Sequence, residues 1–104
     1  MKVQLITFAG CPNADSAREL LRRTLLRAGL EATFEEIDSL SPDAPEHLRE
    51  WGSPTILIDG VDAGGEQKPT GRSCRFYPDA TGGLQGSPPE PVLLRAIQAA
   101  KRAD

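Results

Sequence analysis

The sequence of 104 residues contains only two cysteines, Cys11 and Cys74. Two cysteines are too few for the disulfide framework that holds small secreted domains together, and a reducing compartment would disfavour a permanent bridge between them. If these residues do more than fill space, we therefore expect them to act through thiol chemistry.

Long apolar runs are also lacking. No stretch approaches the ~20 apolar residues that a membrane-spanning helix needs. Residues 1–8 carry one lysine and lead directly into patterned sequence, without the small-residue cleavage site of a secretory leader. We expect a cytoplasmic protein with no membrane partner.

The sequence also lacks an excess of positive charge. Twelve basic residues stand against fifteen acidic ones, which gives a formal net charge of −3. Nucleic-acid binders usually carry a clustered basic surface, so no nucleic-acid partner is expected. We predict that Arg22, Arg23 and Arg27 line a solvated face of a helix. The length indicates one domain over residues 1–104.

The first half of the chain reads as strand, helix, strand. Residues 2–8 are rich in the β-branched and aromatic residues of a buried strand. Residues 12–28 carry apolar side chains at helical spacing, and Gly29 can end that helix with left-handed backbone angles. Residues 30–38 alternate as a second strand, and this order implies a right-handed parallel crossover.

The second half predicts a hairpin and further helices. Ser41 and Pro42 favour a short second helix through Leu48 and Trp51. The Asp59-Gly60 pair between apolar runs predicts two antiparallel strands. Residues 64–86 contain six glycines and predict a long loop with at most one brief strand, before a last helix that follows Ser87. The expected fold is a single α/β domain, a four-stranded mixed sheet flanked by three helices.

Cys11 lies where the first strand gives way to the first helix. A thiol attacks disulfides or binds soft metals as the thiolate, and the positive end of a helix favours that anion. The alternative is that Cys11 is a small buried apolar residue, as many free cysteines are. The helix-end position favours a functional role.

Three local motifs carry a resemblance to a known family. They are FAGCPNA at residues 8–14, GSPT at 52–55 and IDGVDAGG at 58–65. With the predicted order of elements, they make the chain resemble the thioredoxin superfamily, most closely its glutaredoxin-like branch. The resemblance implies that Cys11 is the reactive residue, that Pro54 follows a cis peptide bond and lies against Cys11, and that further residues border the substrate groove. These groove residues are Pro12, Ser53, Pro54 and Thr55.

The chain departs from that family at Ala14, where a dithiol oxidoreductase would have its second cysteine. What remains is monothiol chemistry, in which a mixed disulfide at Cys11 is resolved by another thiol. Cys74 could provide that thiol if residues 61–63 form the fourth strand, because the loop could then return toward Cys11. If residues 73–77 form it instead, Cys74 begins at the far end of the sheet. The Asp59-Gly60 turn favours the first arrangement.

The sequence thus predicts a thioredoxin-like monothiol redox protein, with Cys11 and Cys74 as catalytic residues. Its partner would be a protein or small-molecule thiol; no bound cofactor is expected, although glutathione could act as the reductant. One alternative is an accessory protein that handles soft metals or organomercurials through the same two cysteines. Another is a thioredoxin-fold binding module in which neither thiol reacts. The substrate and the oligomeric state are not specified, and Phe76 and Tyr77 receive no role.

Overall fold

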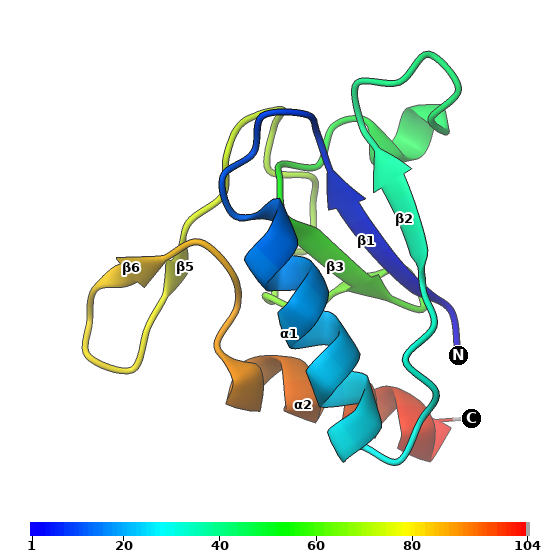
Figure 1. Ribbon diagram of the computed structural model, residues 1–104, viewed down its shortest axis with the longest axis vertical. Helices are drawn as coiled ribbons and strands as arrows, with labels where there is room; N and C mark the ends of the chain where they lie inside the picture. Colours follow the sequence, from blue (N-terminus) through cyan, green and yellow to red (C-terminus); the bar gives the residue numbers. More distant parts are fainter. Residues whose placement is uncertain (104) are drawn as a thin grey trace.

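The computed structural model, which describes residues 1–103, contains a four-stranded mixed sheet in the order β2-β1-β3-β4 (Figure 1). The strands are β1 (Val3–Thr7), β2 (Glu35–Asp38), β3 (Thr55–Ile58) and β4 (Val61–Asp62). β1 pairs with β2 in parallel and with β3 antiparallel, and β3 pairs antiparallel with β4. The four-stranded mixed sheet that the sequence predicts is confirmed.

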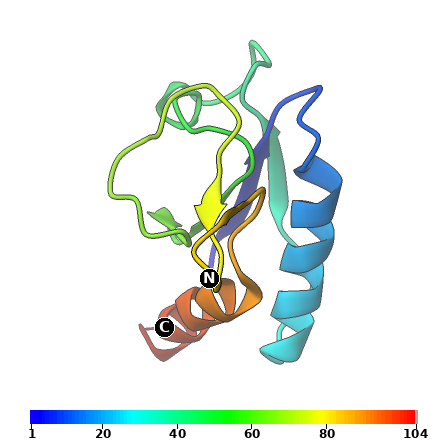
Figure 2. The same cartoon turned by 90° about the vertical axis from the view of Figure 1, so that its left-hand side faces the viewer.

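Two helices, α1 (Ala14–Arg27) and α2 (Glu90–Ala103), pack into one core with the sheet. α1 runs along one face of the sheet, and α2 crosses near the foot of the sheet (Figures 1 and 2). Their apolar sides pack on residues of β1 and β3 that point to the same face. The fully buried members of this core include Leu5, Leu21, Ile56, Leu93 and Ile97. Burial of this apolar surface is the main force that holds the two helices on the sheet. We call the side of the sheet to which Leu5 and Ile56 point the α1 face.

The opposite face is covered by a smaller cluster. Ile6 and Leu57 point from the sheet toward Leu48 and Trp51. The only regular helix in this region is a 3₁₀ turn, η1 (Glu46–Leu48). This surface is the η1 face.

The predicted second helix through residues 41–51 is therefore wrong, and the described chain has two α-helices rather than three flanking the sheet. Pro45, which lies in the interior of the predicted helix, explains the difference. Proline has no backbone N–H, and inside a helix it removes a hydrogen bond and collides with the preceding turn. The apolar residues of the segment are buried without an α-helix.

The hairpin between β3 and β4 forms at the predicted turn. Asp59 and Gly60 have φ angles of 51° and 83°, and positive angles at both positions are typical of the tight turn that matches the twist of two strands. β2 is shorter than the predicted strand over residues 30–38. Among the described strands it pairs with β1 alone, from Gln4 opposite Glu35 to Thr7 opposite Asp38.

The segment over residues 64–86 is more ordered than the predicted loop. It contains a second, two-stranded sheet formed by β5 (Tyr77–Pro78) and β6 (Leu84–Gln85). In the turn between them the Asp79 carboxylate accepts hydrogen bonds from the amides of Thr81 and Gly83. Throughout residues 1–103, every helix is too short or too polar to cross a bilayer.

Candidate functional site

Cys11 lies in the connection between β1 and α1. Its amide donates a hydrogen bond to the carbonyl of Phe8 at 3.2 Å, which closes the turn after the strand. Asn13 precedes the first residue of α1 as its N-cap. Cys11 is partly buried and Pro12 is exposed. The thiol thus stands at the N-terminal end of α1, at the position that the sequence predicts.

Residues 53–55 enter β3 beside the end of β1. Ile6 is paired with Thr55, so the preceding residues lie alongside the end of β1 that leads to Cys11. The Ser53–Pro54 peptide bond is cis. Ser53, Pro54 and Thr55 are all buried, and the Thr55 hydroxyl donates to the carbonyl of Gly52 at 2.6 Å. Contact between Pro54 and Cys11 stays a prediction.

Cys74 is brought to the same end of the sheet. It forms an isolated parallel bridge with Ser53. The Ser53 amide donates to the carbonyl of Ser73 at 3.0 Å, and the Arg75 amide donates to the carbonyl of Ser53 at 2.8 Å. In both views the segment that carries Cys74 passes the end of the sheet where β1 leads into the Cys11 connection (Figures 1 and 2). Val61–Asp62 forms β4, which is the arrangement that lets Cys74 return.

The alternation of side chains directs Cys74 to the side opposite Arg75. Arg75 is buried and bonded to Thr55 and Asp62, which belong to the η1 face because Asp62 is paired with Leu57. Successive side chains of an extended segment point to opposite faces. Cys74 and Phe76, both exposed, therefore point away from the buried side chains of Arg75, Thr55 and Asp62 and into solvent.

A buried polar cluster anchors the segment behind Cys74. The two terminal nitrogens of the Arg75 guanidinium donate to the two oxygens of Asp62, each at 3.0 Å, and one also donates to the Thr55 hydroxyl at 3.1 Å. The exposed side-chain fractions are 7% for Arg75 and 0% for Asp62. This is a bidentate ion pair removed from water, a geometry that the guanidinium fork favours.

Two aromatic rings complete the cluster. The Arg75 guanidinium lies 4.4 Å from the ring centre of Tyr77 and 5.8 Å from that of Trp51, within the range of cation–π attraction. The Tyr77 hydroxyl donates to the carbonyl of Pro54 at 2.5 Å. Burial raises the pKa of this hydroxyl well above its ordinary value, because the tyrosinate would lose its hydration.

Two glycines make room for these contacts. A Cβ atom on Gly52 would lie 2.5 Å from the carbonyl oxygen of Ser73 and 2.7 Å from Cγ of Arg75. A Cβ atom on Gly64 would lie 2.7 Å from Cε2 of Tyr77. Both positions need glycine because another chain segment approaches their backbone.

The same long segment also touches the Cys11 motif at its other end. A Cβ atom on Gly86 would collide with the carboxamide of Asn13, so these two residues pack directly on each other. The segment over residues 64–86 thus contacts Ser53 near Cys74 and returns against Asn13, two residues from Cys11. Nothing in the local sequence signals this second contact.

Sequence reasoning found the thiols but missed the residues that hold Cys74. Arg75, Asp62 and Tyr77 received no role. A signal was present in the sequence, since Asp62 interrupts an apolar strand. A buried carboxylate requires a partner, and an arginine in an otherwise weakly patterned segment is a candidate for one.

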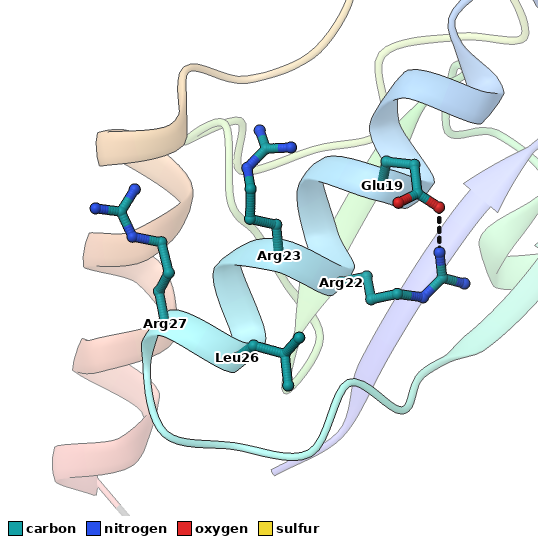
Figure 3. A pocket seen from close by; sticks show the side chains of 5 residues that line it. All are labelled: Glu19, Arg22, Arg23, Leu26 and Arg27. Carbon is teal, nitrogen blue, oxygen red and sulfur yellow. Dashed lines mark hydrogen bonds and ion pairs between the residues drawn. The ribbon is translucent and has the colours of Figure 1, made fainter.

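Neither a cluster of metal ligands nor the surface hollow on α1 contributes a residue to the region around the two cysteines. Among residues 1–103, no group of three or more His, Cys, Asp or Glu side chains could hold a metal ion. A hollow of about 390 Å³ lies on α1, where Arg22 pairs with Glu19 (Figure 3). Arg23 and Arg27 both pair with Glu90 at the start of α2. These arginines join two helices and lie on α1 away from the thiols.

Comparison with protein-family models, with curated proteins and with solved structures gave no significant match.

Proposed function

We propose that this protein is a thioredoxin-like monothiol redox protein, in which Cys11 exchanges with a disulfide substrate and Cys74 resolves the intermediate. The observation that carries the proposal is the pairing of Cys74 with Ser53, at the end of the sheet where β1 leads to Cys11. The parallel β1-α1-β2 crossover, followed by the β3-β4 hairpin and α2, supports a thioredoxin-like fold.

The reaction begins at Cys11. Its thiolate attacks one sulfur of the substrate disulfide, a Cys11 mixed disulfide forms, and the other half of the substrate leaves as a thiolate that takes up a proton. The positive end of α1 favours the attacking anion. Ala14 provides no thiol within the motif, so the mixed disulfide persists until a second thiol reaches it.

Cys74 provides that second thiol. Its thiolate attacks Sγ of Cys11, the second half of the substrate leaves as a thiolate, and a Cys11–Cys74 disulfide forms. Two equivalents of a small thiol such as glutathione then reduce this bond and become a disulfide themselves. The cycle therefore transfers two electrons from a cytoplasmic thiol pool to the substrate disulfide.

The groove residues divide into two groups in this scheme. Pro12 is exposed and would contact the substrate through its side chain. Ser53, Pro54 and Thr55 are buried, and the amide and carbonyl of Ser53 are already bonded to the Cys74 segment. These three residues shape the floor of the groove.

The experiment is mild oxidation with glutathione disulfide, followed by mass spectrometry of the intact protein and its peptides. We expect a Cys11–Cys74 bond in the native chain and a stable glutathione adduct at Cys11 in Cys74→Ser. Cys11→Ser is the matched control and should not form the bond. The absence of both the bond and the adduct would overturn the proposal.

A second candidate function uses the same two thiols to hold a soft metal ion. It is favoured by the position of both cysteine-bearing segments at one end of the sheet, because soft ions such as Cu(I) and Hg(II) prefer thiolate ligands. Stoichiometric Cu(I) binding that is lost in both Cys11→Ser and Cys74→Ser would support this candidate. Binding that survives either substitution would exclude it.

A further inference from the structure

The ion pair between Asp62 and Arg75 is the most deeply buried charged feature among the described residues. Its two side chains are 0% and 7% exposed, and both guanidinium ends are used. Burying two charges costs hydration that the mutual attraction often only balances, so a buried pair is weak evidence for stability alone. We propose that this pair positions Cys74, by fixing the register of residues 73–77 against Ser53.

The inference rests on the proposed function and extends it to two residues that touch no substrate. The connection is covalent and short. Arg75 follows Cys74 directly, and its amide donates to the carbonyl of Ser53 while its side chain is held by Asp62 and Thr55. The backbone and the side chain of one residue therefore fix the segment at two points.

Register decides which face Cys74 occupies. In an extended segment a slip of one residue moves every side chain to the other face. If residues 73–77 slipped by one position against Ser53, the thiol would point to the η1 face. In the observed register the guanidinium meets the Asp62 carboxylate, and a slip of one residue would turn the guanidinium to the face opposite Asp62, so the ion pair selects against the slipped register.

The rest of the segment is anchored mainly on the side before Cys74. The amide of Gly71 donates to the carbonyl of Glu50 at 2.8 Å, and the Thr70 hydroxyl accepts from the amide of Gly52 at 3.2 Å. After Cys74, the anchors are Arg75 and the hydroxyl of Tyr77 on Pro54. Without Arg75, the nearest side-chain anchor after Cys74 would be Tyr77, three residues away.

The test measures the effective concentration of Cys74 at Cys11, from the equilibrium of their disulfide with reduced and oxidised glutathione. A flexible tether gives effective concentrations of about millimolar, and a thiol held in place gives much higher values. We expect Arg75→Lys, which keeps the charge but loses the bidentate fork, to lower the value at least tenfold.

A second variant separates the loss of the ion pair from a general loss of stability. The pair Arg75→Met with Asp62→Leu replaces the charges with apolar groups of similar size, an exchange that often leaves stability unchanged. It should lower the effective concentration at least as much as Arg75→Lys does. Ile97→Val, in the core under α2, is the control for a small general loss of stability and should leave the value within a factor of two.

Hydrogen exchange provides a readout that does not depend on redox chemistry. The amides of Ser53 and Arg75 should lose protection from exchange in Arg75→Lys and in the double variant Arg75→Met with Asp62→Leu. They should keep it in Ile97→Val. An unchanged effective concentration together with unchanged protection in folded variants would overturn the positioning role. If the native chain forms no Cys11–Cys74 bond, the proposed function fails; loss of amide protection would still show that the pair fixes the register.

Discussion

Ser53 and Cys74 lie opposite each other in a parallel backbone bridge, and this bridge is what brings the second thiol to the end of the sheet that carries the first. On one side of residues 53–54 lies the end of β1, which leads to Cys11. On the other side lies the segment of Cys74. The entry to β3 is therefore flanked by both cysteine-bearing segments.

Gly52 is expected to be intolerant of a side chain. In Gly52→Ala the new methyl group would meet the backbone carbonyl of Ser73 at 2.5 Å, and backbone cannot move aside cheaply. We expect the free energy of unfolding in urea to fall by on the order of 1–3 kcal/mol, as overpacking typically does. The effective concentration of Cys74 should fall with it.

Gly83→Ala is the matched control for Gly52→Ala. The nearest atom to a Cβ there is a carboxylate oxygen of Asp79 at 2.9 Å, a longer approach than the 2.5 Å at Gly52 and to a side chain rather than to the backbone. Equal losses of unfolding free energy in the two variants would contradict the close approach at Gly52.

The contact between Gly86 and Asn13 predicts a coupling between two distant substitutions. Gly86→Ala alone should destabilise the chain and slow disulfide exchange at Cys11, because the methyl group would push on the Asn13 carboxamide. Asn13→Ala removes the obstacle, and Asn13 makes no side-chain capping bond that would be lost. The double variant should recover most of the loss.

Urea unfolding of the four proteins in this cycle gives the interaction energy. Residues in direct contact typically couple by about 0.5–3 kcal/mol. Additive effects of the two substitutions would show that residues 86 and 13 do not touch.

Tyr77 predicts the behaviour of the protein in alkali. Its pKa is raised by burial in the folded state, so the unfolded chain loses the phenolic proton first. The contribution to stability is complete below the ordinary tyrosine pKa of about 10 and is lost as the pH rises from there toward the folded pKa. The chain has one tyrosine, so tyrosinate absorbance reports this group alone.

Titration of the folded protein should therefore show tyrosinate forming at higher pH than in urea. Tyr77→Phe should remove this part of the alkaline pH dependence. It should also cost about 1 kcal/mol at neutral pH, through the lost hydrogen bond to Pro54. A folded-state titration at the ordinary pKa would show that the hydroxyl is not buried.

The ion pairs of Glu90 predict that Glu90→Gln lowers the thermal midpoint at neutral pH but not in acid. Hydrogen bonding with Arg23, aided by the charge of Arg27, lowers the pKa of Glu90. A lowered folded-state pKa gives stability that is present above the ordinary glutamate pKa and is lost as the pH falls through the folded value. Glu90→Gln should thus lower the thermal midpoint at neutral pH and have no effect in acid.

High salt should shrink the neutral-pH difference, because the pairs that Glu90 makes are with exposed arginines. Glu31→Gln is a suitable control at an exposed glutamate. A midpoint difference that persists unchanged in acid would show that the carboxylate charge is not what joins α1 to α2.

The sequence predicts the elements whose causes are local. The Asp59-Gly60 turn and the left-handed Gly29, with a φ angle of 78°, depend on neighbouring residues only. The middle helix fails because Pro45 outweighs the apolar spacing around it. Cys11 can be recognised as a candidate because its position between strand and helix is also local.

The contacts around Cys74 could not be derived in the same way. The Asp62–Arg75 pair and the packing of Gly86 on Asn13 join residues far apart in the chain. These residues meet only because the folded sheet brings their segments together. A glycine-rich segment has too little periodicity for its register to be predicted from the sequence. The sequence indicated that the loop carrying Cys74 could return toward Cys11. The position of β4 and the bridge to Ser53 show where Cys74 lies.

The most direct test of the account is the fate of a glutathione adduct made at Cys11. We predict that in the native chain Cys74 displaces the glutathione in a first-order step whose rate does not depend on protein concentration, and that in Cys74→Ser the adduct persists. Equal lifetimes of the adduct in the two proteins would contradict the claim that Cys74 resolves the chemistry of Cys11.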